Sequence, residues 1–169
     1  MTDIQIREEI PGDITAIRTL TEAAFRGRPY ADGDEQDVID RLREADALVL
    51  SLVALDDDEV VGQVTFSPAI NEDNTGPWFA LGPVSVSPER QGEGIGASLI
   101  EAGLTRLAST GALGCILTGD PNYYSRFGFE VSPATCAEKE PAEFFQLKLL
   151  QGNTPRGRFT FHGAFYDES

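Results

Sequence analysis

The sequence predicts a single α+β domain, in which a mixed central β-sheet of about six to seven strands is flanked by about four helices. The first observation is size, because 169 residues with 41% hydrophobic content can bury one sizeable core but hardly two. We therefore expect one domain over residues 1–169. The second observation is the segment order, which mixes strand-like and helix-like patterns without repeats or linkers. The third is a long apolar-striped helix between two strands, the connection that parallel neighbours require.

The chain opens with a strand and two amphipathic helices. Residues 4–10 alternate apolar and polar side chains, as a half-buried strand does. Pro11-Gly12-Asp13 ends that strand, and Asp13 is placed to cap the next helix. A second, acidic helix is expected over about residues 34–44. The inward apolar stripes are Ile14, Ile17, Leu20 and Ala24 in the first helix and Val38, Ile39 and Leu42 in the second.

Three strands then form a meander, over residues 48–55, 60–66 and 78–87. The first two are joined by Asp56-Asp57-Asp58-Glu59, which predicts a solvated hairpin turn. Such an acidic run can also attract a cation, but a charged turn is the more ordinary interpretation. An irregular stretch, residues 71–77, separates the second strand from the third.

The C-terminal half supplies the remaining elements. A glycine-rich turn after the third meander strand opens a helix that we expect to end near Ser109, and residues 112–119 read as the next strand. The crossover between these two strands predicts a parallel pair with a right-handed connection. A short helix is expected over 122–127, and late strands over 143–150 and 158–165.

The glycine-rich turn, RQGEGIG, is the most informative stretch. A glycine costs a helix interior roughly 1 kcal/mol relative to alanine, so three glycines here indicate that the backbone must approach something closely. The first amides of a helix have no intrahelical partner and lie at the positive end of its dipole, so such a turn binds anions. No Gly-Lys-Ser/Thr follows, which excludes a nucleotide P-loop. The glycines also lie far from the first strand, which argues against a dinucleotide fold.

Gln91-Gly92-Glu93-Gly94-Ile95-Gly96 resembles the pyrophosphate-binding turn of the GNAT superfamily of N-acetyltransferases, whose pattern is Gln/Arg-x-x-Gly-x-Gly/Ala. It follows a strand ending V-S-V-S-P and opens an apolar-striped helix, as the family requires. Downstream, GDPNYYSRFGFE resembles the family's second signature, and especially that of a bacterial and archaeal subgroup of predicted N-acetyltransferases. The likeness covers nearly the whole chain. It implies the GNAT fold, with a splayed strand pair that forms a wedge for an acyl-CoA.

The resemblance implies acetyl-CoA, or another acyl-CoA, as donor, and it assigns residues by position. The backbone of the last wedge strand would pair with the pantetheine arm, the amides of the turn would hold the pyrophosphate, and two arginines are candidates for the adenosine phosphates. In that order the residues are Val84, Ser85 and Val86; Gln91, Gly92, Glu93, Gly94, Ile95 and Gly96, with Ala97 and Ser98 nearby; and Arg90 and Arg126, with Asn122 as a polar contact on the far side.

The implied activity is direct transfer of an acetyl group to a primary amine, of a small molecule or a peptide, in a ternary complex. The backbone N–H of Val86 would stabilise the oxyanion. Tyr124 stands where the family keeps its general acid, which protonates the departing thiolate. The alternative is that Tyr124 only packs against Phe127 and Phe129. A catalytically silent acyl-CoA-binding module would share the turn and differ at Tyr124 and in having no open acceptor pocket.

The general base is not identified by the sequence. Some GNAT members carry a glutamate early in the strand before the turn, but residues 78–81 contain none. Deprotonation would then proceed through water or through a carboxylate such as Glu35. The single histidine, His162, falls in the last expected strand, where a structural role is the better interpretation.

The net charge of the chain limits the classes of partner that we expect. The 28 acidic and 13 basic residues give a formal charge of −15, which repels a phosphate backbone and excludes nucleic acid as an expected partner. The acidic surface could attract cationic amines, or it could reflect a salt-rich cytoplasm, where ions screen self-repulsion. The sequence leaves these alternatives open, as it does the choice between monomer and homodimer.

The remaining residue types predict a cytoplasmic protein without a metal. Cys115 and Cys136 lack metal-site spacing and are expected to be reduced, with Cys115 in a buried strand. No apolar run reaches the roughly 20 residues of a membrane span. The charged start of the chain lacks the apolar region of a secretion signal.

Overall fold

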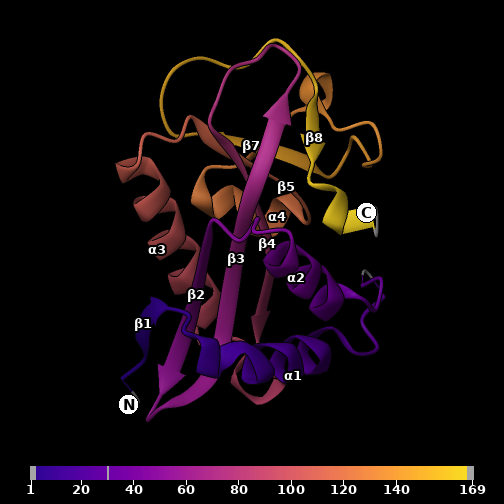
Figure 1. Ribbon diagram of the computed structural model, residues 1–169. Helices are drawn as coiled ribbons and strands as arrows, with labels where there is room; N and C mark the ends of the chain where they lie inside the picture. The colour runs from indigo at the N-terminus through magenta and orange to yellow at the C-terminus, as the bar shows by residue number, and fades with distance from the viewer. Residues whose placement is uncertain (1–2, 30, 167–169) are drawn as a thin grey trace.

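The computed structural model describes residues 3–29 and 31–166. Its centre is a mixed sheet of eight strands (Figure 1). The strand order is β1-β2-β3-β4-β5-β7-β6, and β8 pairs with the far end of β3. Among the strands of the described residues, β4 and β5 pair in parallel and the other pairs are antiparallel. The strands are β1 (Gln5–Glu8), β2 (Leu50–Asp56), β3 (Glu59–Asn71), β4 (Trp78–Val86), β5 (Gly114–Thr118), β6 (Glu130–Val131), β7 (Phe145–Leu149) and β8 (Phe159–Phe161).

Helices cover both faces of the sheet. In β2, Val53 and Leu55 pack with Ile17 and Ile39 of the first two helices, whereas Leu52 and Ala54 belong to the cluster under the third. The alternation follows from the two-residue period of a strand. The helices are α1 (Ile14–Phe25), α2 (Glu35–Glu44), α3 (Ile95–Ser109) and α4 (Pro121–Tyr124), with 3₁₀ turns η1 (Pro11–Asp13), η2 (Pro88–Arg90), η3 (Ser125–Phe127), η4 (Pro133–Thr135) and η5 (Gly163–Tyr166).

The predicted mixed sheet, the parallel crossover through α3 and the tight acidic hairpin are confirmed. Asp56 pairs with Glu59 across the β2–β3 turn. Asp57 and Asp58 have φ values of 48° and 71°, the left-handed conformation that a two-residue hairpin turn of this hand requires. Aspartate tolerates this conformation better than most residues, so the acidic run is explained by the turn.

Three local expectations were wrong. Asp13 does not cap α1 with its side chain, because its carboxylate instead accepts hydrogen bonds from Ile10 N and Arg7. The last strand ends at Phe161, so His162 lies after it, and η5 follows. The second meander strand continues to Asn71, because β8 pairs with residues 69–71 and extends the sheet there. The two-residue strand β6 was not predicted.

Within the described residues, none of the helices combines the length and apolar character needed to cross a bilayer.

Candidate active site

A wedge opens between β4 and β5. The two strands pair only from Trp78 with Gly114 to Ala80 with Ile116. Beyond that point β5 continues against β7, while β4 runs on to Val86 along β3. The edge of β4 that faces away from β3 is therefore open over its last residues, as expected for a splayed strand pair.

The register decides which backbone groups face the wedge. Ser87 N donates to Val61 O at 2.9 Å, and hydrogen-bonded pairs alternate along an antiparallel ladder. The backbone of Ser85 therefore faces β3, and that of Val84 and Val86 faces the wedge. The Ser85 hydroxyl is buried and is bonded to Gln63 Nε2 at 2.8 Å and to Thr21 Oγ1 at 3.2 Å, so it fastens β4 to β3 and α1.

The glycine turn lies at the end of β4 and opens α3. Gly92 and Gly94 both have a φ of 84°, and no atom lies within 4 Å of where their Cβ atoms would stand. Gly94 is the N-cap of α3, and its carbonyl accepts from Ser98 N at 3.0 Å. The amide of Ser98 is thus used inside the helix. The preceding amides, residues 95–97, form no backbone hydrogen bond within the described chain, and unpaired amides at a helix start are groups that can accept an anion as partner.

Side chains of the turn hold it in place. Arg90 lies 2.7 Å from Asp56 and 3.1 Å from Glu93 in ion pairs, and these hydrogen bonds raise the pKa of its guanidinium. Gln91 Nε2 donates to the open carbonyl of Val86 at 3.2 Å, and Gln91 Oε1 accepts from Arg28 at 3.0 Å. The structure thus gives Arg90 and Glu93 a supporting role at the turn.

The far wall of the wedge is α4 and the turn after it. Asp120 caps this short helix by accepting from Asn122 N at 2.9 Å. The side chain of Asn122 is exposed. Tyr124 packs edge-on against Tyr123 and Phe129, with ring centroids 5.0 and 6.1 Å apart. Its ring also passes so close to Gly119 that a Cβ there would lie 2.7 Å from Tyr124 Cε2.

Tyr123 was missed by the sequence reasoning, although the structure brings it to the turn. Its hydroxyl lies 3.6 Å from where a Cβ would stand on Gly96, which in turn is 3.5 Å from Val86 Cγ2. Arg126 donates through Nε to Tyr123 O at 2.8 Å, and its Cζ lies 4.4 Å above the Tyr123 ring. Burial raises the pKa of the Tyr123 phenol, and the Arg126 charge opposes part of that rise.

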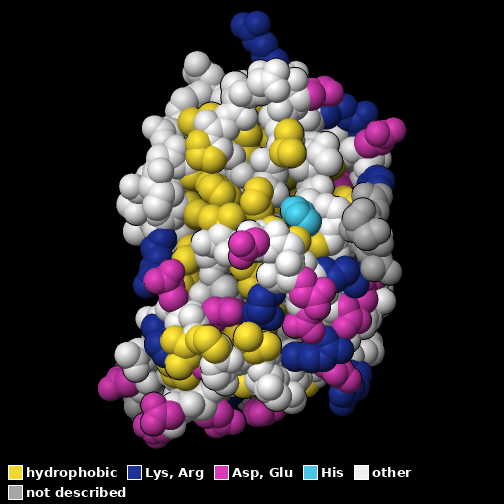
Figure 2. All heavy atoms as spheres, viewed as in Figure 1, with side chains coloured by type: hydrophobic (Ala, Val, Ile, Leu, Met, Phe, Trp, Pro, Cys, Tyr) yellow, Lys and Arg dark blue, Asp and Glu magenta, His cyan; other side chains and the backbone are white. Residues whose placement is uncertain are grey.

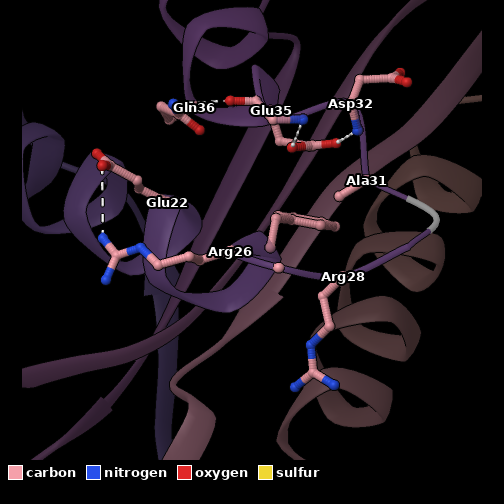
Figure 3. A pocket seen from close by; sticks show the side chains of 10 residues that line it. Glu22, Arg26, Arg28, Ala31, Asp32, Glu35 and Gln36 are labelled. Atoms are coloured by element: carbon pink, nitrogen blue, oxygen red, sulfur yellow. Dashed lines mark hydrogen bonds and ion pairs between the residues drawn. The ribbon is translucent and has the colours of Figure 1, made fainter.

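A pocket of about 320 Å³ lies between α1 and α2 (Figure 3). One of its lining residues, Arg28, donates to Gln91 of the glycine turn. Glu22 faces it from α1, paired with Arg26 at 3.6 Å. Glu35 faces it from α2, but its oxygens accept from Asp32 N at 2.9 Å and Gly33 N at 3.2 Å. The lining residues are Glu22, Phe25, Arg26, Gly27, Arg28, Ala31, Asp32, Gly33, Glu35 and Gln36.

The other reactive side chains do not join this site. Cys115 and Cys136 are buried free thiols, as expected, and desolvation raises the pKa of Cys115 to about 12. His162 Nδ1 accepts from Ala164 N at 3.0 Å, which ties it to the start of η5. The carboxylates of Asp32, Asp34 and Glu35 lie within 4.8 Å of one another, but these residues are exposed or half-buried. The Glu35 oxygens already accept hydrogen bonds from backbone amides of the loop.

A family model described as an acetyltransferase (GNAT) domain matches residues 5–132. The chain belongs to the GNAT acetyltransferase family. The uncharacterized N-acetyltransferase YhbS of Escherichia coli K12 is 38% identical over 128 residues, which are 75% of this chain and 74% of that protein.

Solved GNAT structures agree with the fold over its whole length. A GNAT family acetyltransferase from Brucella melitensis, crystallised with acetyl-CoA, has a TM-score of 0.86 and 44% identity, covering 98% of this chain and 99% of that one. YhbS from Escherichia coli, crystallised with CoA, has a TM-score of 0.90 and 31% identity, covering 100% and 95%. The predicted family and the mixed-sheet GNAT fold are confirmed.

Proposed function

We propose that this GNAT enzyme transfers an acetyl group from acetyl-CoA to a primary amine of a small molecule or peptide. The observation that carries the proposal is the meeting of three features at one place: the open edge of β4, the free amides at the start of α3 and the aromatic wall of α4. Support comes from two relatives of similar fold, one crystallised with acetyl-CoA and the other with CoA.

The donor would lie along the open edge of β4. Its pantetheine amides would pair with the backbone of Val84 and Val86, as an added strand does. Pairing at Val86 O requires the Gln91 carboxamide to move aside, since that carbonyl now accepts from Gln91. The pyrophosphate would lie against the turn, where Gly92 and Gly94 leave open space.

The reaction would proceed by direct attack. The neutral amine nitrogen bonds to the thioester carbon, and the carbonyl oxygen becomes an oxyanion that the Val86 N–H stabilises. The carbon–sulfur bond then breaks, and the phenol of Tyr124 gives its proton to the departing thiolate. The amine proton leaves through water, and a proton returned through water restores the phenol of Tyr124. The oxygens of Glu35 already accept from Asp32 N and Gly33 N of its own loop.

The pocket between α1 and α2 supports a cationic acceptor. Glu22, Asp32 and Glu35 place carboxylates around it, and carboxylates attract an ammonium group before it loses its proton. Arg26 and Arg28 also line the pocket, so the same cavity could receive an acceptor that carries an anionic group beside the amine.

Calorimetry with acetyl-CoA, followed by thiol-release assays on a panel of amines, tests the function. Wild-type protein should bind acetyl-CoA and release CoA with at least one amine. Binding without turnover on every amine would favour the silent acyl-CoA-binding module, and no binding would contradict both functions.

A pair of glycine variants locates the donor. Gly94→Val should reduce acetyl-CoA affinity because the side chain would enter the open space at the turn. Its φ of 84° strains valine regardless of ligand, so Gly111→Val is the matched control. Gly111 has a φ of 90°, also with open space around it, at the other end of α3. Equal affinity losses in both variants would contradict the assignment of the turn.

A further inference from the structure

Tyr123 reaches the first turn of α3 from the opposite wall of the wedge. Its hydroxyl lies 3.6 Å from the Cβ position of Gly96, the second residue of α3. The backbone of residues 95–97 offers its unpaired amides at the same place. A hydroxyl and a set of helix-start amides thus face one another at the mouth of the wedge, on separate elements.

The ring of Tyr123 is held on several sides. It packs edge-on against Tyr124 at 5.0 Å and Phe127 at 5.5 Å, and Arg126 lies over its face at 4.4 Å. The helix that carries it is fixed by the Asp120 cap. Because the ring is fixed, its hydroxyl can meet a ligand with little loss of side-chain entropy.

The hydroxyl itself is available. Across residues 3–29 and 31–166 it forms no hydrogen bond with another group. Burial raises the phenol pKa, so the group keeps its proton at neutral pH and can donate to an anion. A phenol of this kind complements a phosphate oxygen, and the neighbouring Arg126 guanidinium adds positive charge.

We propose that Tyr123 is a donor-binding residue, whose hydroxyl donates a hydrogen bond to the diphosphate of CoA where that group lies against the start of α3. The inference rests on the proposed use of acetyl-CoA. It gives the two adjacent tyrosines different roles: Tyr123 binds the diphosphate, and Tyr124 protonates the departing thiolate. Tyr123 lies in the same GDPNYYSRFGFE stretch as Tyr124, but the family resemblance gives a role to Tyr124 alone, so the assignment of Tyr123 depends on its position beside Gly96.

The test measures the affinity of CoA and of dephospho-CoA for wild-type protein, Tyr123→Phe and Tyr124→Phe by calorimetry. Dephospho-CoA keeps the diphosphate and lacks the 3′-phosphate. Tyr123→Phe should bind both ligands about tenfold more weakly, the usual effect of losing a hydrogen bond to a charged group. Tyr124→Phe loses a hydroxyl from the same aromatic cluster and should bind both ligands as the wild type does. Melting curves check that each variant is folded.

Several outcomes would overturn the inference. Wild-type affinity in Tyr123→Phe would do so while leaving the proposed function intact. A loss with CoA that disappears with dephospho-CoA would move the hydroxyl to the 3′-phosphate. An equal loss in Tyr124→Phe would show that the aromatic packing, not the Tyr123 hydroxyl, is responsible. Failure of the wild type to bind either ligand would overturn the proposed function as well.

Discussion

Tyr124 is the residue whose loss should affect turnover most selectively. A phenol that only protonates the leaving thiolate contributes in the transition state and little in the ground state. Tyr124→Phe should therefore keep near-normal acetyl-CoA affinity while kcat falls at least about tenfold, toward the lower end of general acid catalysis because water can partly replace the donor. Steady-state kinetics beside direct binding measures both quantities.

The packing around Tyr124 supplies the control for that experiment. Its ring lies against Gly119 and Phe129, and these contacts do not involve the hydroxyl. Phenylalanine keeps these ring contacts, and a melting temperature of Tyr124→Phe within a few degrees of the wild type would show that a drop in kcat reports chemistry. Wild-type turnover in the variant would remove Tyr124 from the mechanism and leave it a packing role.

At the residue scale, spacing in the sequence can single out a candidate residue, but it does not give the orientation of its side chain or backbone. The spacing of Tyr124 from Gly128-Phe129 is a pattern, so it could be recognised. The reach of Tyr123 toward Gly96 depends on how α4 sits across the wedge, which only tertiary packing determines. Likewise, Ser85 was expected to serve the donor, whereas the strand register turns its backbone toward β3.

Asp13 gives a pH-dependent prediction. Its carboxylate accepts from Arg7 Nη1 at 2.7 Å and from Ile10 N at 2.9 Å, and the Arg7 hydrogen bond is the main cause of its lowered pKa. A carboxylate whose folded pKa is lowered stabilises the fold above its unfolded pKa of about 3.9, and this contribution is lost as pH falls through the folded value.

Asp13→Asn should therefore lower the free energy of unfolding by about 1.5 kcal/mol at pH 7, the scale of a charged hydrogen bond. The difference from wild type should shrink as the pH falls below about 4, where Asp13 of the unfolded chain takes up a proton before the folded carboxylate does, and it should be lost once the pH passes the lowered folded pKa. Urea unfolding over a pH series measures it. Glu44→Gln, an exposed change on α2, should show no comparable difference. A constant difference for Asp13→Asn at all pH values would mean that the charge is not responsible.

Among the elements, α3 depends on close contact with β3. Gly103 lies over the ring of Phe66, and a Cβ on Gly103 would overlap that ring. Phe66 is fully buried, so its ring can move aside only by displacing neighbouring core side chains. The helix also passes close to Gly62, where a Cβ would lie 2.9 Å from Ile95 Cγ2. Small residues on both partners thus set the distance between α3 and the sheet.

Gly103→Ala should lower the free energy of unfolding by about 1 kcal/mol, because an overpacking cost of about 1–3 kcal/mol is only partly offset by the roughly 1 kcal/mol of helix propensity gained. Gly96→Ala makes the same change in the same helix, where the new Cβ meets Val86 and Tyr123 at 3.5 and 3.6 Å. These are ordinary contacts, so this variant should be neutral or slightly stabilised. Urea denaturation of both proteins decides; equal stability would show that Phe66 can repack.

Elements with a local signal were predictable, and those defined by a partner strand were not. The periodicity of apolar residues predicts α1, α2 and α3, and the turn residues predict the β2–β3 hairpin. By contrast, β6 has only two residues, and it exists because Glu130 and Val131 meet Leu147 and Gln146 of β7. The end of β3 was also missed, because residues 69–71 are ordered by β8, a strand about 90 positions later.

For the whole molecule, the charge distribution is the dominant property. Over α1 and α2, acidic and basic side chains lie among one another on the surface (Figure 2). Several are paired, including Arg18 with Asp40 at 2.6 Å and Arg43 with Glu9 at 3.0 Å. With 28 acidic and 13 basic residues, however, the chain keeps a formal charge of −15 at pH 7. Long-range repulsion among them should oppose folding at neutral pH.

Salt should therefore stabilise this protein. Between about 0.1 M and about 1 M KCl the Debye length falls from about 10 Å to about 3 Å. Repulsion between distant carboxylates is then screened, whereas exposed ion pairs contribute little and lose little. We expect Tm at pH 7 to rise steadily over this range.

Scanning calorimetry at pH values near the pI of about 4.3 is the control, because the net charge nearly vanishes there and the KCl effect should vanish with it. A Tm that is flat in KCl at pH 7 would show that self-repulsion does not limit stability, and the acidic surface would then be better explained by attraction of a cationic amine toward the pocket between α1 and α2.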